Sequence, residues 1–260
     1  MKMKVELISH TPEALSLLLK TKGTRLKHDS DPATWTDEQR AEHLAYMKDT
    51  IKSSWEFVDY VFRIEGVTRA FTHQLVRTRT GSYAQESQRT VDVRDHEVVA
   101  PDFSGLPQDQ DLVEAYWDEA VIKIKDTYAS LMEHGVPAQD ARGILPTNIT
   151  TSIIAKFNLR TLHEMAKLRL CTRTQGEYQR VFREMRARVI EIHPWVGEHD
   201  FLEVHCAANG TCAFPRYGKT SCGLYHPAMD LDWLKKQVKR QYWSAAPQVA
   251  VPVAKDGRTM

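Results

Sequence analysis

The sequence lacks the features that mark a membrane protein or a nucleic-acid-binding protein. Its longest apolar runs are only a few residues, whereas a transmembrane helix needs about 20. The formal net charge of the 260 residues is +1, so no global field favours binding to polyanions. The opening residues, MKMKVELISH, contain no apolar core of signal-peptide length. We therefore expect a cytoplasmic protein that binds neither a membrane nor nucleic acid.

Cysteine is scarce, and without a secretion signal a disulfide framework is not expected. The four cysteines are Cys171, Cys206, Cys212 and Cys222. The last three, together with His205 and His226, are dense enough to hold a soft metal ion. However, their spacing of Cys-x5-Cys-x9-Cys lacks the close Cys-x2-Cys pair of most zinc modules. We predict reduced, packed thiols and no metal, with zinc as the alternative.

Neither an internal repeat nor a break in composition divides the chain. Its residues are 42% hydrophobic and 27% charged, which is ordinary for a globular protein. We predict a single domain over residues 1–245 and a mobile tail over residues 246–260, where little can pack.

Alternation of apolar and polar side chains predicts the strands. Residues 4–10 and 58–65 both show this period of two, and Gly66 is expected to end the second strand. Residues 89–95 read as extended, and residues 144–157 are rich in threonine and isoleucine, as strands are.

Helical spacing and capping residues predict the helices. The first pieces are expected to begin at Thr11 and to break at Gly23 and near Pro32, while Thr68 caps a short helix that ends at Arg77. The expected helices lie in pieces within 10–52 and at 68–77, 109–134, 138–142, 158–170 and about 174–191. This order predicts an α+β fold, with a mostly antiparallel sheet flanked by helices.

The stretch RTRTGSYAQESQR, residues 77–89, gathers three arginines with serines and glutamines. Guanidinium groups bind phosphate oxygens in a bidentate way, and hydroxyl groups can fill the remaining acceptor sites. The stretch is therefore suited to a phosphate monoester. The alternative is a solvated loop in which the arginines pair with Glu86 and Asp92.

The spacing in this stretch resembles the signature of the flavin-dependent thymidylate synthases. That signature is Arg-x-Arg, then seven residues, then Ser, and here it reads Arg77-Thr78-Arg79 followed by Ser87 and Arg89. Two further blocks are similar to the family: NLRTLHEMAKLRL, residues 158–170, and ARGILP, residues 141–146. The resemblance covers roughly residues 55–180 and implies the fold of that family.

The resemblance also implies roles for individual residues. The implied dUMP contacts are Gln74, Arg77, Gln85, Glu86, Ser87, Arg89, Arg142 and Arg169. The implied FAD contacts are Glu56, Arg77, Thr78, Arg79, Gln85, Asn158, Arg160, Glu164 and Arg173. For the chemistry, Arg169 is expected to stabilise negative charge on the uracil oxygens. Ser87 has no histidine base beside it in sequence, so we expect it to donate a hydrogen bond rather than act as a nucleophile.

Helical geometry gives a separate expectation for the second block. At 100° per residue, Asn158 and Arg169 fall within about 20° of each other, and Arg173 lies one turn further on. One helical stripe would then present all three side chains to a site. Arg160 and Glu164 are four residues apart, and the alternative for this pair is a surface ion pair.

Some positions depart from the family pattern. Thr78, Thr90 and Phe57 stand where the family usually has histidine, tyrosine and histidine. On the flavin side, Glu164 replaces an asparagine and Arg173 replaces a histidine. The implied nucleotide contacts are retained, so binding of dUMP is better supported than the detailed flavin contacts.

The resemblance implies C5-methylation of dUMP to dTMP by a homotetramer with sites shared between subunits. Reduced FAD would supply the hydride, and methylenetetrahydrofolate and NADPH would be the co-substrates. Two alternatives stay open. One is a flavin-dependent dUMP hydroxymethylase on the same scaffold; the other is a non-catalytic protein that binds a nucleotide or a nucleic acid.

Overall fold

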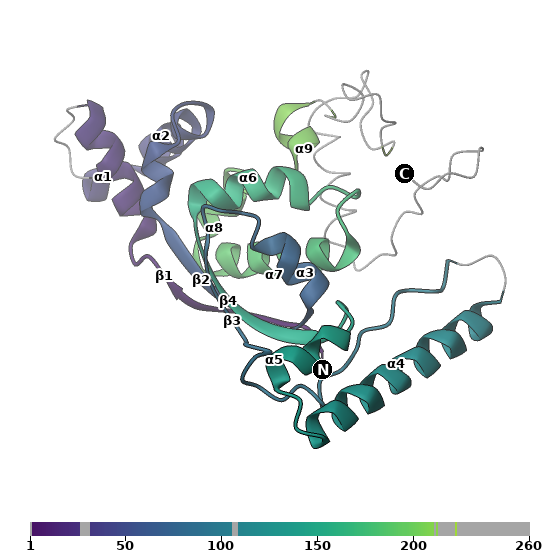
Figure 1. The fold of residues 1–260 in the computed structure, drawn as a ribbon. Helices are drawn as coiled ribbons and strands as arrows, with labels where there is room; N and C mark the ends of the chain where they lie inside the picture. The colour runs from purple at the N-terminus through teal and green to yellow at the C-terminus, as the bar shows by residue number, and fades with distance from the viewer. Residues whose placement is uncertain (1, 27–31, 106–108, 211, 213–221, 223–260) are drawn as a thin grey trace. The chain divides into compact units, whose positions relative to one another are not determined.

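The computed structural model describes residues 2–26, 32–105, 109–210, 212 and 222 (Figure 1). Its secondary structure confirms the predicted α+β class. A four-stranded antiparallel sheet has the strand order β1-β2-β4-β3, formed by β1 (Lys4–His10), β2 (Asp59–Thr68), β3 (Ser82–Gln85) and β4 (Thr150–Asn158). No helix among the described residues is long and apolar enough to cross a membrane. The predicted tail, residues 246–260, lies outside the described residues.

The helices of the described segments fall between and after these strands. They are α1 (Ala14–Leu26), α2 (Asp37–Asp49), α3 (Arg69–Leu75), α4 (Gln110–Glu133), α5 (Ala138–Ala141), α6 (Leu159–Arg169), α7 (Gly176–Ile192), α8 (Pro194–Glu198) and α9 (His205–Asn209). Three short 3₁₀ helices are η1 (Pro32–Thr34), η2 (Ser53–Phe57) and η3 (Arg142–Ile144). The predicted long helices at 109–134, 158–170 and 174–191 are therefore confirmed within a few residues.

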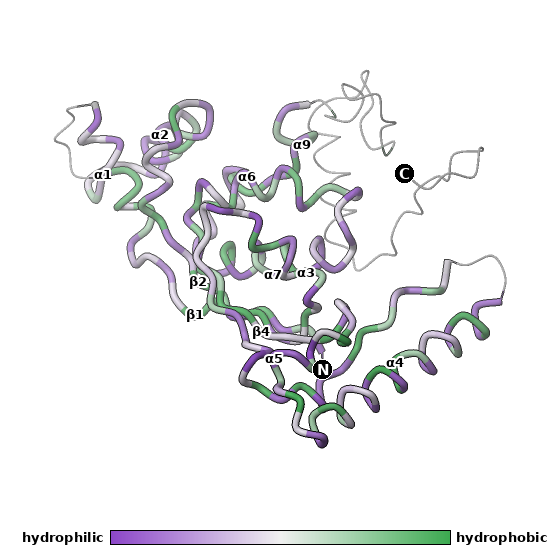
Figure 2. The backbone as a smooth tube through the Cα atoms, viewed as in Figure 1, coloured by the Kyte–Doolittle hydropathy of each residue, from purple (hydrophilic) through white to green (hydrophobic). Residues whose placement is uncertain are grey.

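The chain forms two compact units, which we describe separately. Unit 1 comprises residues 1–4, 63–79 and 83–155, and unit 2 comprises residues 5–62, 80–82 and 156–260. In unit 1, Tyr128 of α4 is buried in an apolar cluster that also holds Val93, Ala141 and Ile149. This cluster fixes the second half of α4. Apolar residues recur along the whole of α4 in Figure 2, and Leu112, Tyr116 and Ile122 are exposed.

The core of unit 2 is built around the fully buried Trp55 of η2. Its ring packs at 4.7 Å from that of Phe201 and meets the edge of His163 of α6 at 4.9 Å. The helices α6 and α7 pack against each other, and α6 also packs against η2 and α9. Burial of such large aromatic side chains is the main favourable contribution to a core of this kind.

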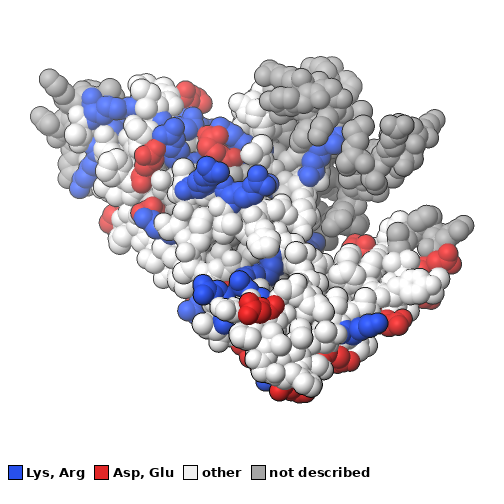
Figure 3. Space-filling view, viewed as in Figure 1, with Lys and Arg blue, Asp and Glu red and all other residues white. Residues whose placement is uncertain are grey.

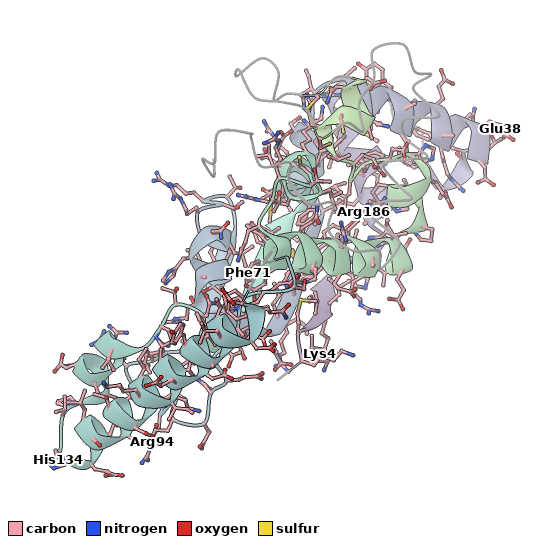
Figure 4. All side chains as sticks on the ribbon, turned by 90° about the vertical axis from the view of Figure 1, so that its right-hand side faces the viewer. Lys4, Glu38, Phe71, Arg94, His134 and Arg186 are labelled. Atoms are coloured by element: carbon pink, nitrogen blue, oxygen red, sulfur yellow. The ribbon has the colours of Figure 1, made fainter. Side chains whose placement is uncertain are left out.

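One ion pair in unit 2 is buried. Arg186 of α7, labelled in Figure 4, donates to a carboxylate oxygen of Glu203 at 2.9 Å and to the carbonyl of Leu202 at 2.8 Å. Both charged side chains are more than 90% buried, so each depends on the other for compensation of its lost hydration. The pair therefore holds Leu202 and Glu203, which follow α8, against α7.

Four local predictions were wrong, each for a physical reason. The Thr11 hydroxyl accepts from the backbone N–H of Asp59 at 2.8 Å, so it does not cap α1. Helix α1 continues through Gly23, and β2 continues through Gly66, which adopts a φ of 65° that glycine tolerates. Residues 89–95 form turns instead of an extended strand, with the N–H of Val91 bonded to the carbonyl of Ser87.

Candidate functional site

The predicted arginine loop begins where α3 ends. The Thr68 hydroxyl accepts from the N–H of Phe71 at 3.1 Å, which confirms it as the cap of this helix. The helix stops at Leu75, and Arg77 follows the turn with its side chain exposed. Gln74, on the last turn, is half-buried. The helix thus delivers Arg77 to the surface of unit 1, as predicted.

Two side chains hold the loop against α3. The Tyr83 hydroxyl lies 3.0 Å from the carbonyl oxygen of Leu75 and 2.6 Å from that of Thr78. The Gln85 amide donates to the Thr72 hydroxyl at 2.8 Å. Thr78 is therefore held through its backbone carbonyl. Because this hydrogen bond does not involve the side chain, it is compatible with threonine in place of the family histidine.

The carboxylates beside the loop are engaged by other groups. Glu86 lies 3.1 Å from the Nε2 atom of His96, and Asp92 pairs with Arg94 at 2.6 Å. The hydrogen bonds from Arg94 hold the pKa of the Asp92 carboxyl below its ordinary value. Within the described residues, no carboxylate pairs with the three loop arginines, which are Arg77, Arg79 and Arg89. The alternative of a loop paired to Glu86 and Asp92 is therefore wrong, and these guanidinium groups are available to an anion.

Sequence reasoning missed Arg69, the first residue of α3. Its guanidinium donates to the carbonyl of Glu86 at 3.2 Å. Burial lowers the pKa of Arg69, and the positive charge of Arg142 lowers this pKa further, so the two cations influence each other. Arg142 itself donates to the carbonyl of Gln139 at 3.0 Å. Arg142 thus has a cationic neighbour in Arg69. The signal for Arg69 in the sequence was its place at the start of the predicted helix that precedes the arginine motif.

Ser87 is placed in a turn with Arg89. The backbone N–H of Arg89 donates to the Ser87 hydroxyl oxygen at 3.2 Å. No hydrogen bond in the described part of the chain joins Ser87 to a histidine. This arrangement is that of a hydroxyl available to donate to a ligand, and it lacks the base that a serine nucleophile needs.

In unit 2, the second motif, residues 158–170, forms helix α6 together with its N-terminal cap. The Asn158 side chain accepts from the N–H of Thr161 at 2.9 Å, so it caps the helix. Arg169 is the last helical residue, whereas Arg173 lies beyond the helix in the turn before α7. Asn158 precedes the helix in extended conformation and Arg173 lies beyond it, so of the three residues only Arg169 is on α6, and the prediction of one helical stripe is wrong.

Two predicted flavin contacts, Arg160 and Glu56, are in contact with each other. The Arg160 guanidinium lies 2.5 Å from the Glu56 carboxylate, and both side chains are about half exposed. Glu164 pairs with Lys167 at 2.9 Å, so the alternative pair of Arg160 with Glu164 is wrong. Close to this pair in sequence, the Thr161 hydroxyl donates to the hydroxyl of Thr80, the residue after Arg79.

Arg169 is held by an aromatic ring. Its guanidinium carbon lies 4.3 Å from the ring centroid of the buried Tyr178 on α7. This cation–π contact orients the guanidinium, and its N–H groups can donate at the edge of the plane. A fixed donor plane of this kind suits a ring carbonyl oxygen.

The comparisons with known proteins identify the class to which this chain belongs. The family model described as "Thymidylate synthase complementing protein" matches residues 6–195, which is most of the chain. The chain is a member of that family, and the resemblance inferred from its motifs is confirmed.

The curated relatives agree with this assignment. A protein named flavin-dependent thymidylate synthase from Sulfurisphaera tokodaii is 32% identical over 202 residues, covering 74% of this chain and 75% of the relative. Proteins of the same name from Geobacter sulfurreducens and Nitratidesulfovibrio vulgaris are 34% and 31% identical. The match to the first covers 75% of this chain and 85% of the relative, and the match to the second covers 85% and 95%.

Proposed function

We propose that this chain methylates dUMP at C5 to give dTMP, with methylenetetrahydrofolate as carbon donor and reduced FAD as hydride source. Family membership and the names of the relatives support the reaction. The observation that carries the proposal is the set of loop arginines, Arg77, Arg79 and Arg89, which no described carboxylate neutralises. NADPH is the expected reductant of the flavin. The specific fold of the flavin-dependent thymidylate synthases is part of this proposal.

On the nucleotide side, the proposal gives each residue a physical task. Arg77, Arg89 and Arg142 bind phosphate and sugar as charge-assisted donors, and Ser87 adds a hydroxyl. Gln74, Gln85 and Glu86 complete the contacts to the nucleotide. Holding the substrate in one orientation converts an encounter into a positioned reaction, which is a large share of catalysis.

The flavin-side residues also fit an anionic cofactor. Arg79 is exposed and follows Thr78, whose backbone carbonyl accepts a hydrogen bond from Tyr83. The Arg160 guanidinium is oriented by its ion pair with Glu56. Both can donate to pyrophosphate oxygens. The remaining proposed contacts are Arg77, Thr78, Gln85, Asn158, Glu164 and Arg173. Bound FAD supplies the hydride, and the protein supplies binding and orientation.

Arg169 carries the electrostatic part of the mechanism. Uracil C5 is a poor nucleophile unless electron density is pushed toward it and the ring oxygens carry the resulting charge. The guanidinium held over Tyr178 donates to these oxygens as the negative charge develops. Because the donor is already positioned, little reorganisation is needed at that moment. Ser87 donates a hydrogen bond and forms no covalent bond.

The second candidate is a dUMP hydroxymethylase on the same scaffold, in which water quenches the exocyclic methylene intermediate. The observation that favours this hydroxymethylase is the departure from the family pattern at Glu164 and Arg173 on the flavin side. A non-catalytic nucleic-acid binder fits less well. On the face shown in Figure 3, Lys and Arg side chains form separate patches interspersed with Asp and Glu, rather than one basic surface.

The proposal includes a homotetramer with sites shared between subunits. The exposed apolar residues of α4, Leu112, Tyr116 and Ile122, are consistent with a subunit interface on that helix. The cytoplasmic location expected from the sequence stays a prediction.

The direct test begins with the visible spectrum of the purified protein. A yellow preparation, or uptake of added FAD by a colourless one, is expected. Analysis of the nucleotide product by mass spectrometry then separates a methyl product from a hydroxymethyl product, which is heavier by one oxygen atom. Failure to bind FAD under any condition would remove both flavin-dependent candidates.

A further inference from the structure

One contact between side chains of unit 1 has no task in the proposed reaction. Glu86 comes directly after β3, and the ring of His96 lies beside its carboxylate. The Oε1 atom of Glu86 is 3.1 Å from the Nε2 atom of His96, and the two side chains are 21% and 27% exposed. Sequence reasoning did not single out His96.

Hydrogen bonds of the backbone fix both residues within unit 1. The N–H of Glu86 donates to the carbonyl of Ser152 in β4 at 3.0 Å, and the Arg69 guanidinium donates to the carbonyl of Glu86 at 3.2 Å. The N–H of His96 donates to the carbonyl of the buried Val93 at 3.0 Å. The contact between Glu86 and His96 therefore joins two segments whose positions are already fixed.

The surroundings of the His96 ring assign its proton. The Nδ1 atom is buried and has no hydrogen-bond partner among the described residues. A proton on Nδ1 would leave a buried N–H without an acceptor, and the bare Nε2 atom would then face a carboxylate oxygen, so that two acceptors would oppose each other. We therefore assign the tautomer with the proton on Nε2, which makes His96 the donor to Glu86.

The second carboxylate oxygen of Glu86 is open to a ligand. In the described part of the chain, no ion pair or hydrogen bond engages Oε2, and this atom is not among the fully buried polar atoms. A carboxylate only accepts hydrogen bonds, so a ligand at Oε2 must supply a donor.

We propose that His96 is a positioning residue for the nucleotide, an inference that rests on the proposed function. By donating from Nε2 to Oε1, His96 fixes the plane of the Glu86 carboxylate. The Oε2 atom then accepts a hydrogen bond from the 3′-hydroxyl of dUMP. His96 acts through Glu86 and does not touch the nucleotide.

The chemistry of dUMP identifies its 3′-hydroxyl as the partner. The phosphate is anionic, so a carboxylate repels it. The two remaining donors are the N3–H of the uracil ring and the 3′-hydroxyl of the sugar. Ser87 and Arg89, which follow Glu86, are proposed to bind phosphate and sugar, so the hydroxyl is the donor nearer to Glu86. A nucleotide without this hydroxyl would leave the carboxylate unpaired, and such a loss discriminates strongly between ligands.

The probe for this contact is 2′,3′-dideoxyuridine 5′-monophosphate, which differs from dUMP only by the missing 3′-hydroxyl. Isothermal titration calorimetry with the full-length, FAD-loaded protein measures both affinities. Wild type is expected to bind the dideoxy nucleotide about 10-fold more weakly, the effect of losing one hydrogen bond to a charged group. His96→Ala should bind dUMP about 3- to 10-fold more weakly than wild type does. Its affinity for the dideoxy nucleotide should be unchanged, because that ligand cannot make the contact.

Further variants separate positioning from a general structural effect. His96→Gln retains a side-chain N–H and should recover most of the affinity for dUMP. In a Glu86→Ala background, His96→Ala should cause no further loss, because the residue through which it acts is gone. The control is His134→Ala, an exposed histidine of unit 1 at the end of α4 that is labelled in Figure 4, and it should bind both nucleotides as wild type does. In turnover, the effect of His96→Ala should appear in the KM for dUMP rather than in kcat, because the hydroxyl is remote from C5.

Equal losses for the two nucleotides in His96→Ala, or unchanged affinity for dUMP, would overturn the inference. Equal binding of the two nucleotides by wild type would overturn the contact to the 3′-hydroxyl. If a thermal melt shows that His96→Ala is unfolded, His96→Phe, which keeps a planar ring without the donor, takes its place. Wild type that binds neither nucleotide would remove the proposed function and this inference together. Wild type that converts dUMP, with no effect of His96→Ala, would remove this inference alone.

Discussion

The guanidinium of Arg160 and the carboxylate of Glu56 lie 2.5 Å apart, although 104 positions separate them in the sequence. Both side chains are about half exposed, so the pair contributes at most about 1 kcal/mol to the free energy of unfolding. Its place beside the Asn158 cap of α6 fits a different task, which is to orient a guanidinium for the cofactor.

Arg160→Ala is expected to weaken FAD binding by about 10- to 100-fold, the effect of losing one charge-assisted hydrogen bond. Glu56→Gln should weaken it by less, because the guanidinium remains and loses only its orientation. Quenching of flavin fluorescence measures both affinities. Equal FAD affinity in wild type and Arg160→Ala would contradict the assignment, and a thermal melt within a few degrees of wild type would show that the fold is intact.

Arg77→Ala is expected to raise the Kd for dUMP by about 10- to 100-fold. The matched control is Arg94→Ala, an exposed arginine of the same segment that is already paired with Asp92. Isothermal titration calorimetry with dUMP compares the two. Equal losses in both variants would indicate a general effect of surface charge and would remove the specific role of Arg77.

Arg169→Ala is expected to lower kcat by about 100- to 1000-fold, as removal of one preorganised donor to a developing oxyanion does. The flavin should stay bound, because this residue is proposed to face the uracil ring. Arg180→Ala, an exposed arginine on α7, is the control and should leave turnover unchanged. Wild-type turnover in Arg169→Ala would end the proposed role.

His163 gives a prediction for stability against pH. Burial lowers its pKa to about 4, and this effect outweighs the opposing one of the hydrogen bond between its Nδ1 atom and the Phe201 carbonyl oxygen, which lie 2.7 Å apart. The unfolded chain binds a proton with a pKa of about 6.5, so between pH 6.5 and about 4 the unfolded state holds more protons than the folded state. Stability should therefore fall as the pH drops through this window, by up to about 3 kcal/mol from this group.

The measurement for this prediction is urea unfolding of wild type and His163→Gln at several pH values. Glutamine cannot titrate and retains a side-chain N–H that can reach the same carbonyl. The variant should show a shallower loss of stability between neutral pH and pH 4, whatever its absolute stability. Identical slopes for the two proteins would show that His163 does not titrate in this range.

Tyr116→Glu tests the proposed interface on α4. Tyr116 is 62% exposed in the single chain, and a carboxylate there should disrupt burial against another subunit. Light scattering is expected to show a smaller assembly than wild type. An assembly of unchanged mass would show that this face of α4 lies outside the interface.

Much of the fold could be read from local patterns. The cap Thr68, the period of two in β2 and the long amphipathic α4 each depend on a few neighbouring residues, and each was predicted correctly in kind. The cap Asn158 was not predicted, because it was expected to lie within the helix. The prediction that Thr11 caps the first helix was wrong because its hydroxyl bonds to Asp59, a partner distant in sequence. The prediction that Gly66 ends β2 was wrong because a glycine in the left-handed region can be accommodated within a strand.

The candidate site divides in the same way. Motif spacing identified the loop arginines and the two ends of α6, because these are fixed by short stretches of chain. The pairing of Arg160 with Glu56 and the influence of Arg142 on Arg69 depend on tertiary folding. Spacing along one segment carries no signal for such contacts.

The release of tritium from 5-tritiated dUMP, followed by the mass of the nucleotide formed, tests the central claim most directly. We predict release that requires FAD, NADPH and methylenetetrahydrofolate together, with dTMP as the product. Release of tritium when FAD, NADPH or methylenetetrahydrofolate is left out would contradict the account. So would the absence of tritium release from a protein shown to hold FAD and dUMP.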